Sequence, residues 1–306
     1  MPTLLQQARF ILGKLGMRPH KRLGQHFLID AAVIERMVTA ADISPEDVVL
    51  EIGPGLGALS ETLTKKAGRL ALVEMDTTLA QRLTERFSND EQVQVIPADF
   101  LRLDLNAVFH DQSLKVVASL PYNVATPILF RLLDYRKLFR VVTVMLQQEV
   151  AARITASPGT KAYGVISVLI QLYASAKPVC TVGPRSFFPV PKVHSQVIQL
   201  VFQDAPRVEV KDIALFRRIV KAAFNQRRKT LRNALRGVSG GDLTISGGDL
   251  EMIGHQANID LQRRGETLSL EEFATLANKW GEQDSGQRRT VRSLYGTQSH
   301  QIRSQR

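Results

Sequence analysis

Gly53, Gly55 and Gly57 follow a short apolar run, Val48–Ile52, and precede a stretch with helical periodicity. Because glycine has no Cβ, it permits a tight turn from strand to helix and a close approach of the backbone to a ligand. About 20 residues later, Glu74 closes the next apolar run, where a carboxylate accepts hydrogen bonds from both hydroxyls of a ribose. A simple tight turn would explain the glycines alone. Together with Glu74 they predict a site for a ligand that contains adenosine.

The residues that follow the next two apolar runs distinguish between the two common ligands of such a site. Asp99 follows the third run and can accept a hydrogen bond from an adenine amino group, and the turn Ser119-Leu120-Pro121-Tyr122-Asn123 follows the fourth. Both lie at the carboxyl ends of predicted strands, where ligands of such sheets bind. The alternative for Asp99 is a turn or helix-capping acid. A dinucleotide site leaves both features unexplained, so the pattern favours S-adenosylmethionine.

The Ser-Leu-Pro-Tyr turn resembles the Asn/Asp/Ser-Pro-Pro-aromatic signature of methyltransferases that act on amino groups of adenine or cytosine. An exocyclic amine is a poor nucleophile, so the site must draw its protons into acceptors and align its nitrogen with the methyl group. The Ser119 oxygen and the Leu120 carbonyl are the expected acceptors, and Tyr122 is expected to stack on an extruded base. Positioning then supplies the rate enhancement without a titrating base. Alternatively, Pro121 only ends a strand and Tyr122 packs in the core.

Seven short β-branched runs alternate with amphipathic ones between residues 48 and 202, which is typical of parallel strands joined by helical crossovers. This pattern predicts a doubly wound, Rossmann-like α/β sheet. The last run alternates apolar and polar residues and follows its predecessor without a long helix, so we expect it to pair antiparallel at an edge. The predicted strands are Val48–Ile52, Leu70–Met75, Val93–Pro97, Lys115–Leu120, Arg140–Leu146, Pro178–Val182 and Val193–Phe202.

After residue 204 the β pattern ends and helical periodicity continues through residues 213–235, 250–253 and 269–280. This predicts an N-terminal leader (1–20), a Rossmann-like domain (21–204), a small all-helical domain (205–283) and a basic disordered tail (284–306). The Gly- and Ser-rich stretch 237–248 is expected to be a flexible loop between helices.

The chain carries 40 lysines and arginines against 29 acidic residues, a formal net charge of +11, and its pI is about 10.0. This charge favours a polyanionic partner such as nucleic acid, although many basic proteins bind nothing acidic. Cys180 is the only cysteine and the six histidines lack metal-ligand spacing, so we expect no disulfide and no metal. No segment is suited to a signal peptide or a membrane span, so we expect a cytoplasmic protein without a membrane partner.

A dense group of cations is interleaved with apolar residues between positions 216 and 236. The apolar residues fit a core-facing helical stripe, which leaves the cations outward. A solvated surface is the alternative, but guanidinium groups suit phosphates, so we expect contact with RNA. The candidates are Arg217, Arg218, Lys221, Arg227, Arg228, Lys229 and Arg232, and Lys21 and Arg22 extend the same basic track ahead of the glycine loop.

Seven ordered stretches, spread over roughly residues 20 to 280, together resemble the ribosomal RNA adenine dimethyltransferase family, and specifically its bacterial small-subunit branch. They are Lys21–Leu28, the Gly53 loop, Ser119–Asn123, Met145–Ala151, Phe187–Val193, Phe224–Asn233 and Arg264–Ser269. The resemblance implies a class I S-adenosylmethionine-dependent methyltransferase that acts as a monomer. Its substrate would be two adjacent adenines near the 3′ end of small-subunit rRNA, within an immature small ribosomal subunit.

The resemblance also implies roles for individual residues. In the cofactor site, His26 and Leu28 would close over the methyl donor, Gly53 and Gly55 would lie against its methionine part, and Glu74 and Asp99 would hold its ribose and adenine. Ser119 would lie between donor and target, with Tyr122 on one face of the base and Phe188 on the other.

Ser119 stands where the family usually has Asn, and Val190 and His194 also depart from its commonest residues. The hydroxyl of Ser119 is shorter than an amide and can also donate a hydrogen bond. Ser119 therefore keeps open the alternative of a ribosome-assembly factor with weak or absent methylation. A large-subunit rRNA adenine methylase is a second alternative, although the stretch Phe224–Asn233 favours the small-subunit branch, and a nicotinamide dehydrogenase is a more remote one.

Overall fold

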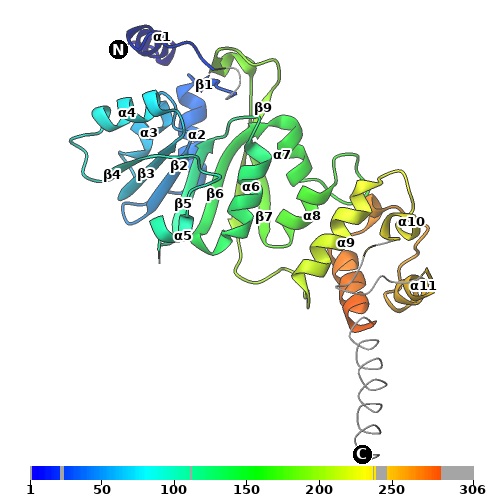
Figure 1. Ribbon diagram of the computed structural model, residues 1–306. Coiled ribbons are helices and arrows are strands. Elements are labelled where there is room, and N and C mark those ends of the chain that lie inside the picture. The colour runs from blue at the N-terminus through cyan, green and yellow to red at the C-terminus, as the bar shows by residue number, and fades with distance from the viewer. Residues whose placement is uncertain (1, 21–23, 111, 237, 239–246, 284–306) are drawn as a thin grey trace, which may run out of the picture. The chain divides into compact units, whose positions relative to one another are not determined.

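A computed structural model of the chain describes residues 2–20, 24–110, 112–236, 238 and 247–283 (Figure 1). It divides into two compact units. The sheet unit comprises Met1–Thr155 and Tyr173–Ala205, and the helical unit comprises Ala156–Leu172 and the chain from Pro206. Residues 156–172 therefore group with the helical unit, whereas the sequence pattern assigned them to the domain at 21–204. The predicted tail (284–306) and most of the stretch 237–248 lie outside the described residues.

The sheet unit is built on a seven-stranded sheet whose strands lie within a few residues of the predicted ones. Its order is β4-β3-β2-β5-β6-β9-β7. Strands β2 to β6 are parallel to one another, so their carboxyl ends meet at one edge of the sheet. The strands are β2 (Val48–Ile52), β3 (Arg69–Glu74), β4 (Val93–Pro97), β5 (Leu114–Ser119), β6 (Phe139–Gln147), β7 (Ala174–Val182) and β9 (Ser195–Phe202).

The position of β9 corrects one prediction. β9 is antiparallel as expected, but it lies between β6 and β7 and is not an edge strand; β7 forms the edge. Residues of β9 such as Val197, Ile198 and Leu200 are fully buried, whereas β7 is partly exposed along most of its length. Pro178 lies within β7, which suits an edge because proline cannot donate a hydrogen bond to a second neighbour.

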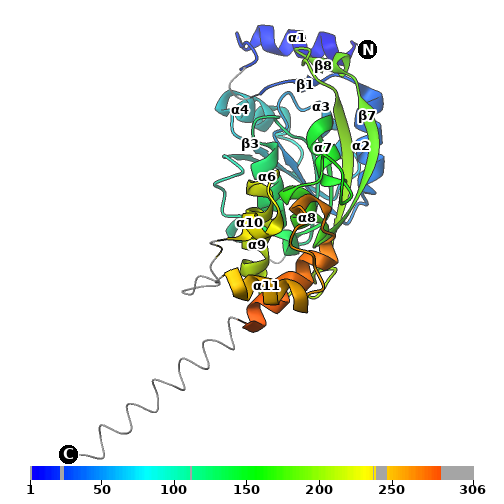
Figure 2. The same ribbon diagram turned by 90° about the vertical axis from the view of Figure 1, so that its right-hand side faces the viewer.

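Helices cover both faces of the sheet, as the positions of α2 and α6 in Figures 1 and 2 show. Aspartates cap the amino ends of α2 and α4: Asp30 accepts from Ala32 and Val33, and Asp76 accepts from Thr78 and Leu79. Capping at Asp76 begins α4 directly after β3. The helices are α2 (Ala31–Ala41), α3 (Ala58–Leu63), α4 (Thr77–Arg86), α5 (Leu105–Val108), α6 (Ala125–Asp134) and α7 (Gln148–Ile154), with 3₁₀ turns at Arg136–Leu138 and Pro184–Ser186.

The N-terminal segment, which the sequence pattern left as a leader, folds into helix α1 (Leu4–Lys14). Thr3 and Gln6 form a capping box that starts it: Thr3 Oγ1 accepts from Gln6 N at 3.2 Å, and Gln6 Oε1 accepts from Thr3 N at 2.8 Å. The buried side of α1, Ala8 and Leu12, packs in a hydrophobic cluster of the sheet unit. This cluster, which we call the α1 cluster, also contains residues of the short antiparallel pair β1 (Phe27–Leu28) and β8 (Phe187–Phe188).

The helical unit contains α8 (Val165–Gln171), α9 (Ile213–Asn225), α10 (Leu231–Leu235), α11 (Gly247–Gln256), a 3₁₀ turn at Gly265–Thr267 and a helix at residues 270–283. The predicted break near Asn225 separates α9 from α10. Phe224 lies in the core of this unit, with ring centres 5.8 Å from Tyr163 and 6.0 Å from Phe273. Within the described ranges, no helix has the length and apolar character needed to cross a membrane.

Candidate functional site

A cavity of about 330 Å³ lies in the sheet unit, at the carboxyl ends of β2 to β5. The strand crossovers bring residues that are far apart in the sequence to this one edge of the sheet. Predicted site residues from five segments line it, namely His26, Leu28, Gly53, Gly55, Glu74, Asp99, Ser119, Leu120 and Tyr122. Most of the predicted cofactor and target-base residues are thus brought together.

The glycine loop requires glycine for two reasons. Gly53 and Gly55 have φ values of +68° and +59°, which side chains rarely adopt. A Cβ on Gly55 would also lie only 3.0 Å from Cδ1 of Phe27. The loop backbone therefore forms one wall of the cavity at close range, as a bound nucleoside needs.

Glu74 is buried at the end of β3 and ties the glycine loop to the start of α4. Its Oε2 accepts from Gly55 N at 3.0 Å, and its Oε1 accepts from Asp76 N at 2.9 Å. Burial raises the pKa of the Glu74 carboxyl, and these two backbone hydrogen bonds partly offset the rise. The side chain still lines the cavity, so each carboxylate oxygen keeps a lone pair for a ligand hydroxyl.

Asp99 combines the two roles that the sequence left open. Its Oδ1 accepts from Leu101 N at 2.9 Å, which is the bond expected of a turn acid, and its Oδ2 lies 3.7 Å from Nε of Arg102. Asp99 also lines the cavity, and its side chain is 33% exposed. The turn therefore presents the carboxylate to the cavity.

The turn after β5 places Tyr122 between a histidine and a hydroxyl. Its ring is stacked on His26, with ring centres 5.6 Å apart and 28° between planes. Its phenol oxygen lies 2.6 Å from Ser195 Oγ, and His26 Nδ1 lies 2.7 Å from the Pro189 carbonyl oxygen. Burial raises the pKa of Tyr122, so the phenol stays neutral. The ring is half-buried and lines the cavity.

The structure distinguishes the two phenylalanines of β8, and only Phe187 lines the cavity. Its ring centre lies 6.5 Å from that of Tyr122, edge to face. Phe188, which was expected against the target base, does not line the cavity. It pairs in register with Phe27 and packs in the α1 cluster, with the Arg9 guanidinium 5.6 Å from its ring centre.

Glu51 is a cavity residue that the sequence analysis missed. It is 2% exposed, and its Oε2 accepts from Ser60 Oγ at 2.6 Å. Its pKa is raised to about 8, mainly by burial and also by the neighbouring Glu74, while the hydrogen bond from Ser60 lowers it. The available signal was an acid inside the otherwise apolar run Val48–Ile52, because a charge in a buried strand is costly without a function.

Replacement of Glu51 by glutamine is expected to change how stability depends on pH. The folded protein holds the Glu51 proton up to about pH 8, whereas the unfolded chain loses it near pH 4.5. The free energy of unfolding should therefore fall by up to about 1.4 kcal/mol per pH unit between these values, a loss that E51Q removes. Thermal unfolding at pH 5 and pH 8 measures this. Relative to the wild type, the unfolding temperature of E51Q should be higher at pH 8 than at pH 5, whereas that of the exposed control E46Q should not change. An equal dependence of the unfolding temperature on pH in E51Q and wild type would contradict the assignment.

The helical unit divides the predicted RNA-binding cations into two groups. Arg227 is used internally: Nη2 donates to the Tyr163 carbonyl at 2.9 Å and forms an ion pair with Glu266 at 3.3 Å. Arg232 forms an ion pair with Glu251 at 2.7 Å, and Arg217 is partly buried. The exposed group comprises Arg218, Lys221, Arg228 and Lys229, while Lys21 and Arg22 lie outside the described residues.

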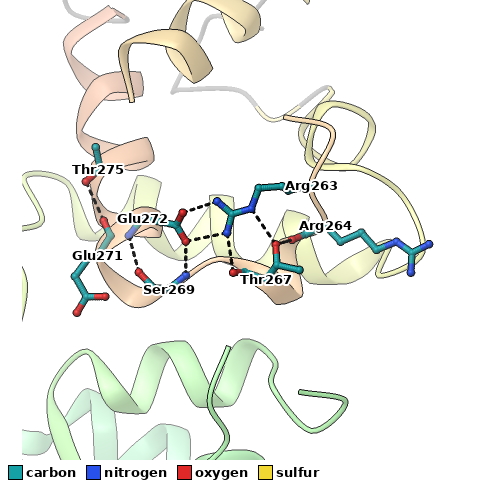
Figure 3. A network of polar contacts seen from close by, with 7 residues as sticks. All are labelled: Arg263, Arg264, Thr267, Ser269, Glu271, Glu272 and Thr275. Carbon is teal, nitrogen blue, oxygen red and sulfur yellow. Dashed lines mark hydrogen bonds and ion pairs between the residues drawn. The ribbon is translucent and has the colours of Figure 1, made fainter. Parts of the chain in front are cut away.

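Arg263 and Arg264 show the same division (Figure 3). Arg263 donates to Glu272 Oε2 at 3.0 Å and to the Thr267 carbonyl at 2.8 Å, and its hydrogen bond holds the pKa of Glu272 below the ordinary value. Glu272 and Ser269 also form a capping box that starts the helix at 270–283. The side chain of Arg264 is exposed and points away from this network. Charge in the sequence alone does not separate structural arginines from exposed ones.

Comparison with known proteins gives one consistent result. A family model described as ribosomal RNA adenine dimethylase matches residues 16–276. A protein named ribosomal RNA small subunit methyltransferase A from Syntrophotalea carbinolica is 46% identical over 260 residues, which cover 85% of this chain and 96% of that protein. The protein of the same name from Geobacter metallireducens is 46% identical over 265 residues, which cover 86% and 95%.

Two solved structures confirm the predicted fold class, a Rossmann-like class I methyltransferase sheet with an additional helical region. A dimethyladenosine transferase from Plasmodium falciparum has a TM-score of 0.69 and 22% identity, covering 82% of this chain and 96% of that one. The 23S rRNA methyltransferase ErmE has a TM-score of 0.64 and 24% identity, covering 83% and 98%.

Proposed function

The chain belongs to the ribosomal RNA adenine dimethylase family, and from this premise we propose that it methylates adenines of small-subunit rRNA with S-adenosylmethionine. The expected products are dimethyladenosines at two adjacent positions near the 3′ end of that RNA. One observation carries the proposal: the glycine loop, Glu74 and the turn from Ser119 to Tyr122 line a single cavity. A cofactor site and a base-binding site therefore share one space, as direct methyl transfer requires.

The residues of the cavity fit S-adenosylmethionine. The loop at Gly53 and Gly55 has positive φ values and a tight approach to Phe27, and its backbone lines the cavity, where the methionine part of the ligand would lie against it. Glu74 would accept from the ribose hydroxyls and Asp99 from the adenine amino group, with His26 and Leu28 closing the site. When bound, S-adenosylmethionine supplies a methyl group on a positively charged sulfur, which an amine nitrogen can attack.

The turn after β5 would hold the target base. We assign the Ser119 oxygen and the Leu120 carbonyl oxygen as acceptors for the two protons of the adenine amine, which draws electron density toward its nitrogen. Tyr122 would stack on one face of the base, and Phe187 replaces Phe188 as the second aromatic contact because Phe187 lines the cavity. Since Tyr122 is neutral and hydrogen-bonded to Ser195, it orients the base without exchanging a proton. The proton released by the amine passes to solvent.

The exposed cations of the helical unit would bind rRNA phosphates, with Arg218, Lys221, Arg228 and Lys229 as the main contacts. Arg227 supports this surface indirectly because it holds the carbonyl of Tyr163. Lys21 and Arg22 stay proposed contacts on charge alone. An immature small subunit in the cytoplasm is the proposed particle, and the protein is proposed to act on it as a monomer.

Two assays on the purified full-length chain test this function. S-adenosylmethionine should protect the protein from thermal unfolding, by about 2.7 kcal/mol at a ligand concentration of 100 times Kd, whereas NADH should not. Label from S-adenosylmethionine should then enter unmethylated small ribosomal subunits and not large ones. Protection by NADH alone would point to a dehydrogenase, and label in large subunits alone would point to the large-subunit methylases.

A further inference from the structure

Helix α1 has one side that no cluster of the sheet unit covers. Ala8, Ile11 and Leu12 pack in the α1 cluster, whereas the opposite side, at spacings of three and four residues, is exposed. The capping box at Thr3 shows that the helix has a defined start. We call its exposed cation-bearing side the α1 face and define it by Arg9, Phe10 and Lys14. The family match begins at residue 16, so it assigns no role to this face.

Phe10 is the most exposed large hydrophobic side chain in the described part of the chain, at 72%. The ring of Phe10 is therefore accessible to a partner. It lies between cations: Arg9 precedes it, and Lys14 follows one helical turn later on the same side. An aromatic ring flanked by cations matches a single-stranded nucleic acid, whose bases stack and whose phosphates pair with charge.

The charge around α1 supports the same partner. The first acidic residue of the chain is Asp30, and the 29 residues before it include five lysines and arginines. The formal net charge of the whole chain is +11, so this short segment contributes nearly half of it. No carboxylate within the segment neutralises Arg9 or Lys14, which favours a polyanion over a protein surface of mixed charge.

The α1 face also lies close to the cavity. Residues of α1 pack in one cluster with Phe27 and Leu56, and both of these line the cavity. Arg9 lies over the ring of Phe188, whose neighbour Phe187 forms part of the cavity wall. Figure 2 shows α1 running across the end of the sheet unit beside β1 and β8.

We propose that the α1 face is a second RNA-binding surface, which holds the rRNA strand beside the target adenines. Phe10 stacks on an unpaired base, and Arg9 and Lys14 contact phosphates. The proposal rests on the proposed function, since it takes rRNA as the substrate. It assigns α1 a part in substrate binding that is separate from the exposed cations of the helical unit.

Three full-length variants test it: F10A, the double variant R9A/K14A, and R9K/K14R, which keeps the charge. K65A/K66A is the matched control, because it removes two exposed cations that lie just before β3, at the sheet edge opposite the cavity. The assay measures methyl transfer to unmethylated small subunits at several salt concentrations, with the affinity for S-adenosylhomocysteine measured by calorimetry.

We expect R9A/K14A and F10A each to raise KM for the subunit roughly tenfold, with kcat and S-adenosylhomocysteine affinity unchanged. R9A/K14A should lower the slope of log affinity against log salt by about 2, since two phosphate contacts are lost. R9K/K14R and K65A/K66A should behave as the wild type.

Several results would overturn the inference. If the wild type is active and KM is unchanged in F10A and R9A/K14A, the α1 face does not bind RNA, while the proposed function still holds. An equal rise in KM for K65A/K66A would show a general charge effect, and a parallel loss of S-adenosylhomocysteine affinity would show that α1 only supports the cavity. If the wild type binds anionic lipid vesicles, F10A does not, and KM is unchanged in both α1 variants, the α1 face would be a membrane-binding surface instead. A wild type that transfers no methyl group would overturn the proposed function and this inference together.

Discussion

Replacement of Glu74 by glutamine is expected to weaken the binding of S-adenosylmethionine about 100-fold, although the two side chains have the same shape. Glu74 accepts one backbone hydrogen bond on each carboxylate oxygen, from Gly55 and from Asp76. A glutamine can accept only one of them and turns its NH₂ group toward the other N–H. Because the site is buried, this lost acceptor costs about 1–3 kcal/mol, and the ribose hydroxyls lose a charged acceptor as well.

Calorimetry with S-adenosylhomocysteine measures this effect without the RNA substrate. E85Q is the matched control, since Glu85 is an exposed residue on α4 outside the cavity, and it should bind as the wild type does. Glu74→Asp keeps the charge on a shorter side chain, so its affinity for S-adenosylhomocysteine should lie between those of E74Q and the wild type. An affinity of E74Q within threefold of the wild type would show that Glu74 only supports the loop and does not contact the ribose.

The second large effect concerns Tyr122. Y122A is expected to lower kcat/KM for the small subunit about 100-fold, because the site loses the ring on which the target base stacks, a contact worth about 1–3 kcal/mol per base. Y122F keeps the ring and its stacking on His26 and loses only the hydrogen bond to Ser195, so it should retain activity within about fivefold.

The comparison of these two variants separates stacking from hydrogen bonding. The affinity of Y122A for S-adenosylhomocysteine should stay within a few-fold of the wild type, since Tyr122 is assigned to the base and not to the cofactor. If Y122F loses as much activity as Y122A, the phenol rather than the ring is required. If neither variant changes kcat/KM, Tyr122 is a core residue, which was the alternative raised by its sequence context.

Local patterns predicted the sheet and much of the cavity because each relevant feature is encoded within a few residues. Glycines at positive φ, an acid at a strand end and a proline-containing turn each mark the end of a strand. Parallel strands then bring these ends together whatever the details of the helices between them. For this reason Gly55, Glu74, Asp99 and Tyr122 could be placed at one site before the fold was known.

Features that depend on pairing partners could not be predicted in the same way. Which face of β8 meets the cavity is set by its register with β1, and a strand of two residues has no periodicity of its own. The insertion of β9 between β6 and β7 likewise follows from tertiary packing, although Pro178 was a usable signal for the edge. Whether Arg227 faces RNA or the protein's own carbonyls depends on residues more than 60 positions away.

The measurement that tests the central claim most directly is the identity of the methylated nucleosides. The full-length protein, labelled S-adenosylmethionine and small subunits from cells that lack this methylation are incubated together, and the rRNA is then digested and its modified nucleosides are mapped. We predict dimethyladenosine at two adjacent positions near the 3′ end, which would also show that Ser119 suffices where the family usually has Asn. Monomethyladenosine alone would contradict dimethylation, and no methylated adenosine from a protein that still binds both subunit and cofactor would favour an assembly factor instead.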